Sequence, residues 1–374
     1  MEVLTQEVPA VQQDLRLHWR MLTVLSLVLV LVPEVFLFVK LPPVTTLYEN
    51  RRLAAKPAAP KTFKQWESYP SELNDYIQDN FPLRARLISW TNTTRYLMGY
   101  SGSKLILVGR HGWLFYDDGT QLKFWRGQHL TDAELGAWME RFRSGLDSVN
   151  RRGIRLYLLF PPYKETIYPE ELPFWMRLQR KTELDQVIER LRTAGLEDHL
   201  IDVRSPLLTR KDTGLLYYPF DSHWNRRGAY IAYRQVIGRM QKDFPDMQPL
   251  PSESFPLRYR RQEGDLAYML GVGQFVGSSY ERTDPVDIDA NTTWLTPRHD
   301  WTAPHILRTG AHNGRTLLLS RDSFSGALVP FLAPHFERII LTYIGEGFFR
   351  KDLIEQFHPD IVLVESIENY CSVF

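Results

Sequence analysis

The sequence contains very little cysteine: of its 374 residues, only Cys371 carries a thiol. A single thiol cannot form an internal disulfide, and it excludes a cysteine-rich zinc site and a Cys-x-x-Cys redox motif. The sequence also lacks an excess of charge of either sign, since 45 lysine and arginine residues stand against 44 aspartate and glutamate residues. This balance gives no support to a nucleic-acid partner. The chain is long enough for one large domain or two ordinary ones. Because composition and charge indicate no partner, the function must be sought in local motifs.

One long apolar run stands out at residues 21–39. At about 1.5 Å per residue in a helix, a run of this length matches a hydrocarbon core of about 30 Å. Pro33 and Glu34 interrupt it, and a carboxyl group in lipid is costly unless it lies near an interface or is protonated. A cleaved signal peptide is the alternative, but no small-x-small cleavage site follows promptly. We therefore expect residues 1–40 to comprise a cytoplasmic tail and a transmembrane anchor.

The next region, residues 41–100, begins with a stretch rich in proline, alanine and charge, which is typical of an extended tether. Apolar positions at helical spacing follow, and they predict two helices broken near Pro82. Residues 104–119 then combine a short apolar strand with glycines and a closing Asp-Asp-Gly, which predicts a β-hairpin.

From Thr131 onward the pattern alternates between helix and strand. Thr131 with Glu134 three residues later is a capping-box signature for a helix that ends at Gly153. The following run, residues 154–160, is mostly apolar, as expected of a strand buried on both faces. The remaining expected elements are helices at 180–194 and 225–243, from Ser325, and at 348–357, and strands at 199–203, 316–320, 337–343 and 360–365.

Repeated βα units of this kind predict an α/β fold, in which a mostly parallel sheet is flanked by helices. We expect one such domain over residues 101–374. Residues 245–312 break the rhythm with many prolines and short apolar runs, and we interpret them as an insertion that is partly β.

In open α/β sheets, reactive groups collect at the carboxyl ends of the strands. Ser323 follows the strand expected at 316–320 and precedes a helix, a context that presents a serine hydroxyl at a helix N-terminus. Free backbone N–H groups and the helix dipole would stabilise an oxyanion there. The alternative is that Ser323 or Ser325 merely caps the helix.

A second group of polar residues, Asp221-Ser222-His223-Trp224, lies in a loop just before the helix expected at 225–243. Serine is a poor nucleophile at neutral pH, so it needs an imidazole within hydrogen-bond reach and an acceptor that holds the imidazole in the right tautomer. Asp221 and His223 can supply both. An Asp-x-His pair alone is weak evidence and also fits an ordinary surface loop. Its combination with a serine at a strand end favours a catalytic triad.

Five segments of the sequence together resemble the AlgX/AlgJ-type polysaccharide O-acetyltransferases, a branch of the SGNH hydrolase fold. In chain order they are DNFPLRARL, LVGRHGWLFYDDG, PPYKETIYPEELP, DSHWNRRGAY and LLLSRDSFS. The similarity covers roughly residues 45–365, and the Asp-x-His pair precedes the serine, a circular permutation of the usual order in that fold. The resemblance implies Ser323 as nucleophile, His223 as base and Asp221 as its orienting acid.

Three further residues are candidates for substrate binding. Arg321 stands where the family has a glycine, which normally permits a tight turn or a close approach of substrate. Its side chain either crowds the nucleophile or recruits an anionic substrate, and both interpretations are open. Lys164 lies in a loop at the carboxyl end of a strand, where it either contacts the polysaccharide or is solvated, and Trp224 follows His223 directly.

The resemblance also implies a large periplasmic domain behind an uncleaved N-terminal helix in the bacterial inner membrane. A membrane-bound O-acyltransferase would deliver the acetyl groups, and a polysaccharide would accept them. Two alternatives remain open: a carbohydrate acetyl esterase with the same triad, and a non-catalytic scaffold that binds glycan or a membrane partner. His299, His305 and His312 match no common zinc motif, so we expect neither a metal nor a cofactor.

Overall fold

The computed structural model describes residues 17–28, 52–81, 83–117, 119, 129–176, 181–255, 257–273, 279–285, 292–297, 300 and 302–372. The chain divides into two compact units, residues 1–94 and 95–374. The larger unit contains both of the motifs that favour a catalytic site.

The smaller unit is helical where it is described. Residues 17–28 form a helix, and α2 (Phe63–Asn80) begins at a capping box between Thr62 and Gln65. α3 (Arg84–Leu97) starts in this unit and ends in the larger one. Among the described residues, no helix combines the length and the apolar character needed to cross a membrane. Residues 29–39 of the predicted anchor lie outside the described part of the chain.

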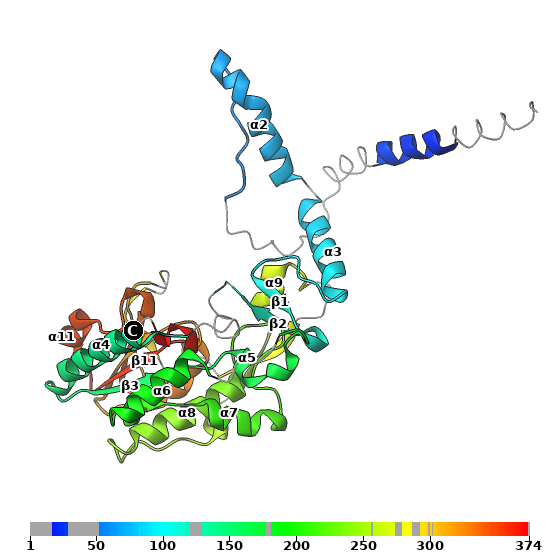
Figure 1. Ribbon diagram of the computed structural model, residues 1–374. Coiled ribbons are helices and arrows are strands. Elements are labelled where there is room, and N and C mark those ends of the chain that lie inside the picture. The colour runs from blue at the N-terminus through cyan, green and yellow to red at the C-terminus, as the bar shows by residue number, and fades with distance from the viewer. Residues whose placement is uncertain are drawn as a thin grey trace, which may run out of the picture. The chain divides into compact units, whose positions relative to one another are not determined.

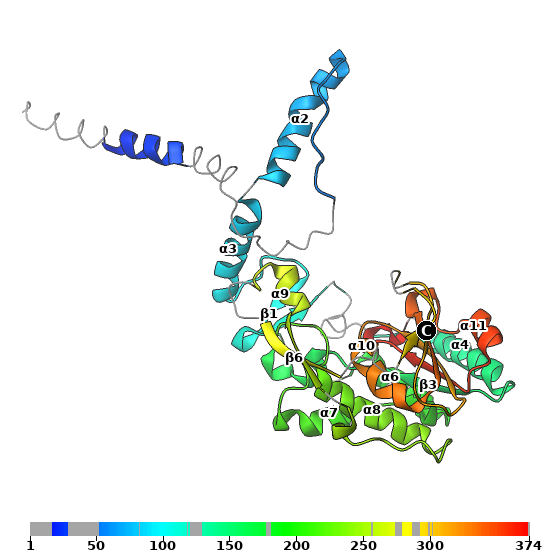
Figure 2. The same cartoon turned by 180° about the vertical axis from the view of Figure 1, so that it is seen from behind.

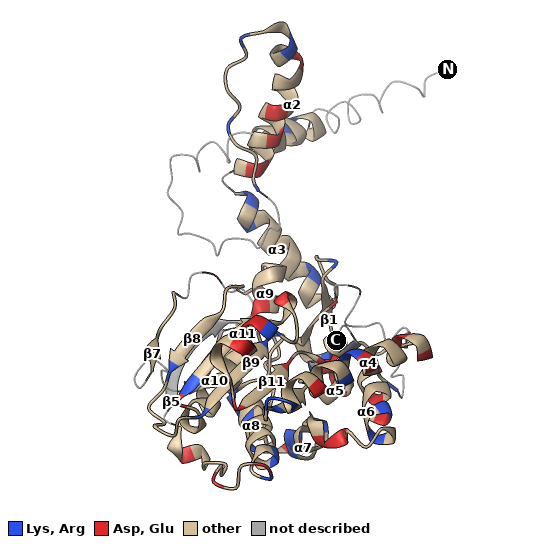
Figure 3. Cartoon of the chain, turned by 90° about the vertical axis from the view of Figure 1, so that its left-hand side faces the viewer, with Lys and Arg blue, Asp and Glu red and all other residues tan. Residues whose placement is uncertain are grey.

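A seven-stranded sheet forms the centre of the larger unit (Figure 1). Its strand order is β4-β3-β11-β9-β10-β8-β7. The first five strands are parallel, and β8 and β7 add an antiparallel edge, which Figure 3 shows. The bounds of the strands are β3 (Arg155–Leu159), β4 (Leu200–Ile201), β7 (Thr293–Trp294), β8 (His305–Arg308), β9 (Thr316–Arg321), β10 (Arg338–Tyr343) and β11 (Ile361–Glu365). The predicted α/β fold with a mostly parallel sheet is confirmed.

Helices cover both faces of this sheet. Successive side chains of a strand point to opposite faces, so each apolar strand supplies side chains to a core on either side. In β9, Leu317 and Leu319 pack into one hydrophobic core and Leu318 into the other. The first core contains side chains from α7 (Arg204–Arg210), α8 (Arg226–Met240) and α10 (Ser325–Leu332). The second contains side chains from α4 (Asp132–Asn150), α6 (Glu183–Thr193) and α11 (Lys351–Phe357). Figures 1 and 2 show the sheet between these helices.

The predicted capping box of α4 is present. The Thr131 side chain accepts a hydrogen bond from the backbone N–H of Glu134, whose carboxylate accepts one from the backbone N–H of Thr131. These bonds satisfy donors that the first turn of a helix leaves without intrahelical partners. The predicted β-hairpin also forms, with β1 (Ile106–Val108) antiparallel to β2 (Leu114–Tyr116).

Only part of the segment predicted as an insertion lies outside the central sheet. Its first part contains α9 (Asp265–Leu270) and a separate antiparallel pair, β5 (Leu257–Glu263) with β6 (Ser279–Pro285). Its last part supplies β7 and β8, which extend the main sheet beyond β10. α9 packs against the β1–β2 hairpin through Leu266 and Leu270. This packing places Asp265, the first residue of α9, beside the loop that carries His223.

Candidate active site

The turn that carries Ser323 is fixed on both sides by Asp322. One carboxylate oxygen of Asp322 accepts a hydrogen bond from the backbone N–H of Phe324 at 2.8 Å, and the other accepts one from the backbone N–H of Ile367 at 2.7 Å. The Ser325 hydroxyl donates to the backbone carbonyl of Asp322. α10 begins after Phe324 without a side-chain cap, so the interpretation of Ser323 or Ser325 as a helix cap is wrong. The Ser323 side chain is exposed at the end of β9.

The loop before α8 brings His223 to this serine across 100 residues of sequence. His223 Nε2 lies 2.8 Å from Ser323 Oγ, and His223 Nδ1 lies 2.7 Å from Asp221 Oδ1. The Asp221 side chain is buried, whereas about 30% of the His223 side chain is exposed. The structure therefore joins the three residues in one chain of hydrogen bonds that ends at an accessible hydroxyl.

The charges around His223 favour its protonated form. Burial alone would lower the pKa of His223, but the hydrogen bond and charge of Asp221, with the charges of Asp265 and Asp322, raise it above 6.5. Burial would raise the pKa of Asp221, but His223 and the backbone N–H groups of His223 and Asp265 hold it well below its ordinary value. An ionised Asp221 can therefore stabilise the imidazolium that forms when His223 accepts a proton.

These charges predict the acid side of the pH–rate profile. Only neutral His223 can accept the Ser323 proton, so kcat/KM for hydrolysis of an acetyl ester is expected to increase as the pH rises through the His223 pKa. The midpoint is expected above 6.5, because that pKa is raised. In Asp221→Asn the midpoint is expected at lower pH, since the largest stabilising charge is gone. A wild-type midpoint at or below 6.5 would contradict this assignment of the base.

Trp224 links the two loops of the site. Its indole N–H donates to the backbone carbonyl of Phe324 at 3.0 Å, and its ring packs edge-on against the Phe324 ring. Phe324 also lies against the His223 ring, with 5.0 Å between the ring centroids. Because Trp224 is almost completely buried, this geometry favours a positioning role, and its contact with substrate stays a prediction.

Lys164, in α5 (Lys164–Ile167), lies beneath the His223 loop rather than in solvent. Its ammonium donates to the backbone carbonyls of Tyr218, Pro219 and Asp221, at 3.2, 3.2 and 2.8 Å. Burial lowers its pKa to about 8. These three bonds hold the loop from below, so the geometry favours support of the loop, and substrate contact by Lys164 stays a prediction.

Arg321, the departure from the family pattern, is also buried. Its guanidinium lies against the antiparallel edge of the sheet, with Nη2 3.4 Å from His305 Nδ1. Burial lowers the pKa of Arg321 to about 10, opposed by the charges of Glu365 and Asp322. The side chain therefore reaches into the protein, and its predicted contact with substrate has no direct support from this position.

Two acidic residues near the site were not anticipated from the sequence. The Asp265 carboxylate accepts hydrogen bonds from the backbone N–H and the hydroxyl of Ser222, and it lies 3.5 Å from His223 Nδ1. Burial and the charge of Asp221 raise the pKa of Asp265. Glu365, at the end of β11, accepts from the backbone N–H of Asp322, and burial raises its pKa well above its ordinary value. No short motif marks either residue, because each reaches the site through tertiary packing.

Among the described residues, Asp221, His223 and Asp265 form a group whose ligand atoms all lie within 4.8 Å of one another. Two carboxylates and an imidazole are suitable metal donors. Here, however, His223 Nδ1 is hydrogen-bonded to Asp221, and Asp265 is bonded to Ser222. The histidines weighed in the sequence lie elsewhere: His305 bonds to the backbone carbonyl of Asp300, and His299 lies outside the described residues.

Comparison with known proteins gives a match to one family model, similar curated proteins and similar solved structures. The family model described as "SGNH hydrolase-like domain, acetyltransferase AlgX" matches residues 106–347. The "Probable alginate O-acetylase AlgJ" of Pseudomonas aeruginosa is 25% identical over 226 residues, which is 59% of this chain and 55% of that protein. The chain thus spans about half the length of the curated relatives it matches.

Among solved structures, Bacillus cereus PatB1 superposes with a TM-score of 0.52 at 15% identity, over 71% of this chain and 96% of that chain. A DHHW family protein from Eubacterium siraeum superposes with a TM-score of 0.51 at 14% identity, over 71% of this chain and 89% of that chain. At such low identity these two similarities establish the shared fold alone.

Proposed function

This chain belongs to the AlgX family of SGNH hydrolase-like acetyltransferase domains, and from that premise we propose that it transfers acetyl groups onto hydroxyls of a polysaccharide through an ester on Ser323. The observation that carries the proposal is the continuous hydrogen-bonded chain from buried Asp221 through His223 to the exposed Ser323 hydroxyl. This arrangement supplies what an otherwise weak serine nucleophile requires.

In the first half of the proposed reaction, Ser323 Oγ attacks the carbonyl carbon of the acetyl donor while His223 Nε2 accepts the serine proton. The bond between the acetyl carbon and the donor oxygen then breaks, and His223 returns the proton to that oxygen as it leaves. Asp221 keeps the second imidazole proton on Nδ1 and stabilises the positive charge. The product is an acetyl ester on Ser323.

In the second half, His223 Nε2 removes the proton from a sugar hydroxyl, and the sugar oxygen attacks the ester carbon. The bond to Ser323 Oγ breaks, and His223 returns the proton to the serine. The acetylated sugar is released, and the enzyme regains its starting state. No step requires a redox cofactor.

Oxyanion stabilisation during both halves has a candidate donor beside the nucleophile. Within the described chain, the backbone N–H of Ser323 donates to no acceptor. It lies just before α10, whose N-terminus adds a favourable dipole. Donors aimed at a developing oxyanion commonly contribute about 10²–10³-fold to the rate. We propose the Ser323 N–H as one such donor.

Water as the acceptor would make the same residues an esterase, and the exposure of His223 gives water a path to the ester. We expect transfer to dominate when a carbohydrate acceptor is present. With an isotopically labelled acetyl ester, label should appear on an added oligosaccharide, and release of free acetate should fall by a matching amount. The oligosaccharide with Ser323→Ala protein is the control. Label found only in free acetate, whatever the acceptor concentration, would identify an esterase.

The location and partners of the protein are part of the same proposal. We place the larger unit in the periplasm, attached to the inner membrane through residues 21–39, and we propose that a membrane-bound O-acyltransferase supplies the acetyl groups. The family membership and the name of the Pseudomonas relative support an extracytoplasmic polysaccharide as acceptor.

A further inference from the structure

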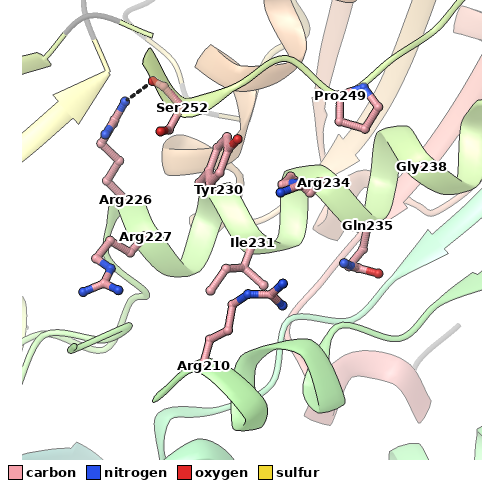
Figure 4. Close-up of a pocket in the computed structure, with 10 residues that line it drawn as sticks. All are labelled: Arg210, Arg226, Arg227, Tyr230, Ile231, Arg234, Gln235, Gly238, Pro249 and Ser252. Atoms are coloured by element: carbon pink, nitrogen blue, oxygen red, sulfur yellow. Dashed lines mark hydrogen bonds between the residues drawn. The ribbon is translucent and has the colours of Figure 1, made fainter. Parts of the chain in front are cut away.

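A pocket of about 500 Å³ lies on the outer side of α8 (Figure 4). The helix forms its floor, Arg210 at the end of α7 borders one side, and the segment from Pro249 to Ser252 borders the other. Its lining along α8 runs from Arg226 to Gly238, which corresponds to about 18 Å of helix at 1.5 Å per residue. The pocket is therefore long enough for an extended ligand.

The lining of this pocket, which we call the arginine pocket, carries charge of one sign. It contains Arg210, Arg226, Arg227 and Arg234 and no acidic residue. The concentration is local, since the whole chain has a formal net charge of only +1. Glu253 borders the pocket without lining it, and its carboxylate accepts a hydrogen bond from the Ser252 hydroxyl.

The four guanidinium groups fall into two kinds. Arg226 donates to the backbone carbonyl of Phe255 at 2.7 Å, and Arg227 donates to the carbonyl and hydroxyl of Thr213, each at 3.0 Å. These bonds hold two of the groups in place. Arg210 and Arg234 are exposed, and neither guanidinium group forms a hydrogen bond or an ion pair within the part of the chain that the structure describes. The pocket thus combines two fixed and two available cationic groups.

A guanidinium has paired donors that match the oxygens of a carboxylate or a phosphate. Four of them around a concave surface without acidic neighbours in the lining concentrate positive potential there. A ligand with several oxyanion groups along an extended chain fits this distribution better than a single small anion. A neutral sugar would leave the available guanidinium groups without an anionic partner.

The arginine pocket is separate from the catalytic residues but lies on an element that continues from them. Ser323, His223 and Asp221 do not line it. α8 nevertheless begins at Arg226, only three residues after His223, so the two backbone positions are at most about 11 Å apart. An extended ligand lying along α8 can therefore have its end near the His223 loop.

We propose that the arginine pocket binds a carboxylate-bearing stretch of the acceptor polysaccharide, next to the sugar that is acetylated. This inference rests on the proposed function, because it assigns the ligand of the pocket as the acceptor of that reaction. A membrane surface with anionic lipids is the competing ligand. The concave shape favours the chain, since a flat array of headgroups contacts convex or planar faces more readily than the floor of a pocket.

The test compares binding of a defined oligouronate with binding of a neutral oligosaccharide of the same length, by titration calorimetry on the full chain. Wild type is expected to bind the oligouronate, with an affinity that falls as salt is added, and to bind the neutral sugar far more weakly. In Arg210→Gln/Arg234→Gln the Kd for the oligouronate is expected to rise about tenfold. The matched control is Arg143→Gln/Arg192→Gln, which removes two exposed arginines from the helices on the other face of the sheet.

An unchanged Kd in the pocket variant, an equal loss in the control variant, or equal affinity for the neutral sugar would overturn the proposal. Vesicles containing phosphatidylglycerol test the competing ligand. Binding to these vesicles that depends on Arg210 and Arg234, without binding of the oligouronate, would assign the pocket to a membrane instead. The titration needs no acetyl donor, so a failure of the pocket proposal and a failure of the proposed reaction are read separately.

Discussion

Replacing Ser323 with alanine is expected to lower kcat for acetyl transfer by about 10⁴-fold or more, the range seen when a nucleophile is removed from a triad. The variant keeps the hydrogen bonds of Asp322 and Trp224 that shape the turn, so it should fold normally. Covalent labelling by a serine-reactive fluorophosphonate gives a second readout. Label should attach to wild type and be absent from Ser323→Ala.

The matched control is Ser325→Ala, which removes a hydroxyl two residues away in the same turn. It should retain labelling, because its hydroxyl bonds to the backbone and does not contact His223. His223→Ala should also lose labelling, and the double variant with Ser323→Ala should be little worse than either single variant, because the two residues act as one unit. Folded wild type that takes no label would instead support the non-catalytic scaffold.

The second large effect is expected at Asp221. An asparagine can place either its oxygen or its N–H₂ at the position of Asp221 Oδ1, which accepts the backbone N–H of His223 at 2.9 Å and lies 2.7 Å from His223 Nδ1. It cannot neutralise the imidazolium, and its amide N–H₂ favours the tautomer whose Nε2 carries the proton and cannot accept one from Ser323. The same change in a serine protease triad lowers kcat by about 10⁴-fold. We expect a loss of about 10³–10⁴-fold in kcat for Asp221→Asn, measured at saturating acetyl donor.

Asp265 provides the contrast for this experiment. Its carboxylate is 3.5 Å from His223 Nδ1, against 2.7 Å for Asp221, and it bonds mainly to Ser222. Asp265→Asn should therefore cost much less activity than Asp221→Asn. The reverse order, with Asp265→Asn the more damaging change, would show that Asp265 is the acid that orients the imidazole.

The sequence predicted the parts of this structure that depend on local patterns. The buried run at 154–160 became β3, and the capping box at Thr131 began α4, because both signals lie within a few neighbouring residues. The strand-end rule also predicted the place of Ser323, which follows β9. The His223 loop follows a helical turn, and its meeting with Ser323 was expected from the chemistry of the Asp-x-His pair and from the family resemblance. Their catalytic roles stay a prediction until the variants are assayed.

The parts that the sequence did not predict depend on contacts between distant segments. β7 has only two residues and β8 four, too few for a periodic pattern. They become strands because β8 pairs with β10 and β7 pairs with β8. Asp265 reaches His223 because α9 packs on the β1–β2 hairpin. The sequence left open substrate contact or solvation for Lys164, and crowding of the nucleophile or anion binding for Arg321. It did not predict that tertiary packing buries both side chains.

The position of β11 makes the site dependent on a segment that is translated well after both catalytic motifs. This strand fills the middle of the sheet between β3 and β9, and Ile367, just beyond it, holds Asp322 in the serine turn. Until residues 361–367 have been translated, the sheet lacks the strand between β3 and β9, and the serine turn lacks the hydrogen bond from Ile367 to Asp322. A nascent or clipped polypeptide without them should lack the proposed activity, which is then expected only of molecules whose synthesis has passed this point.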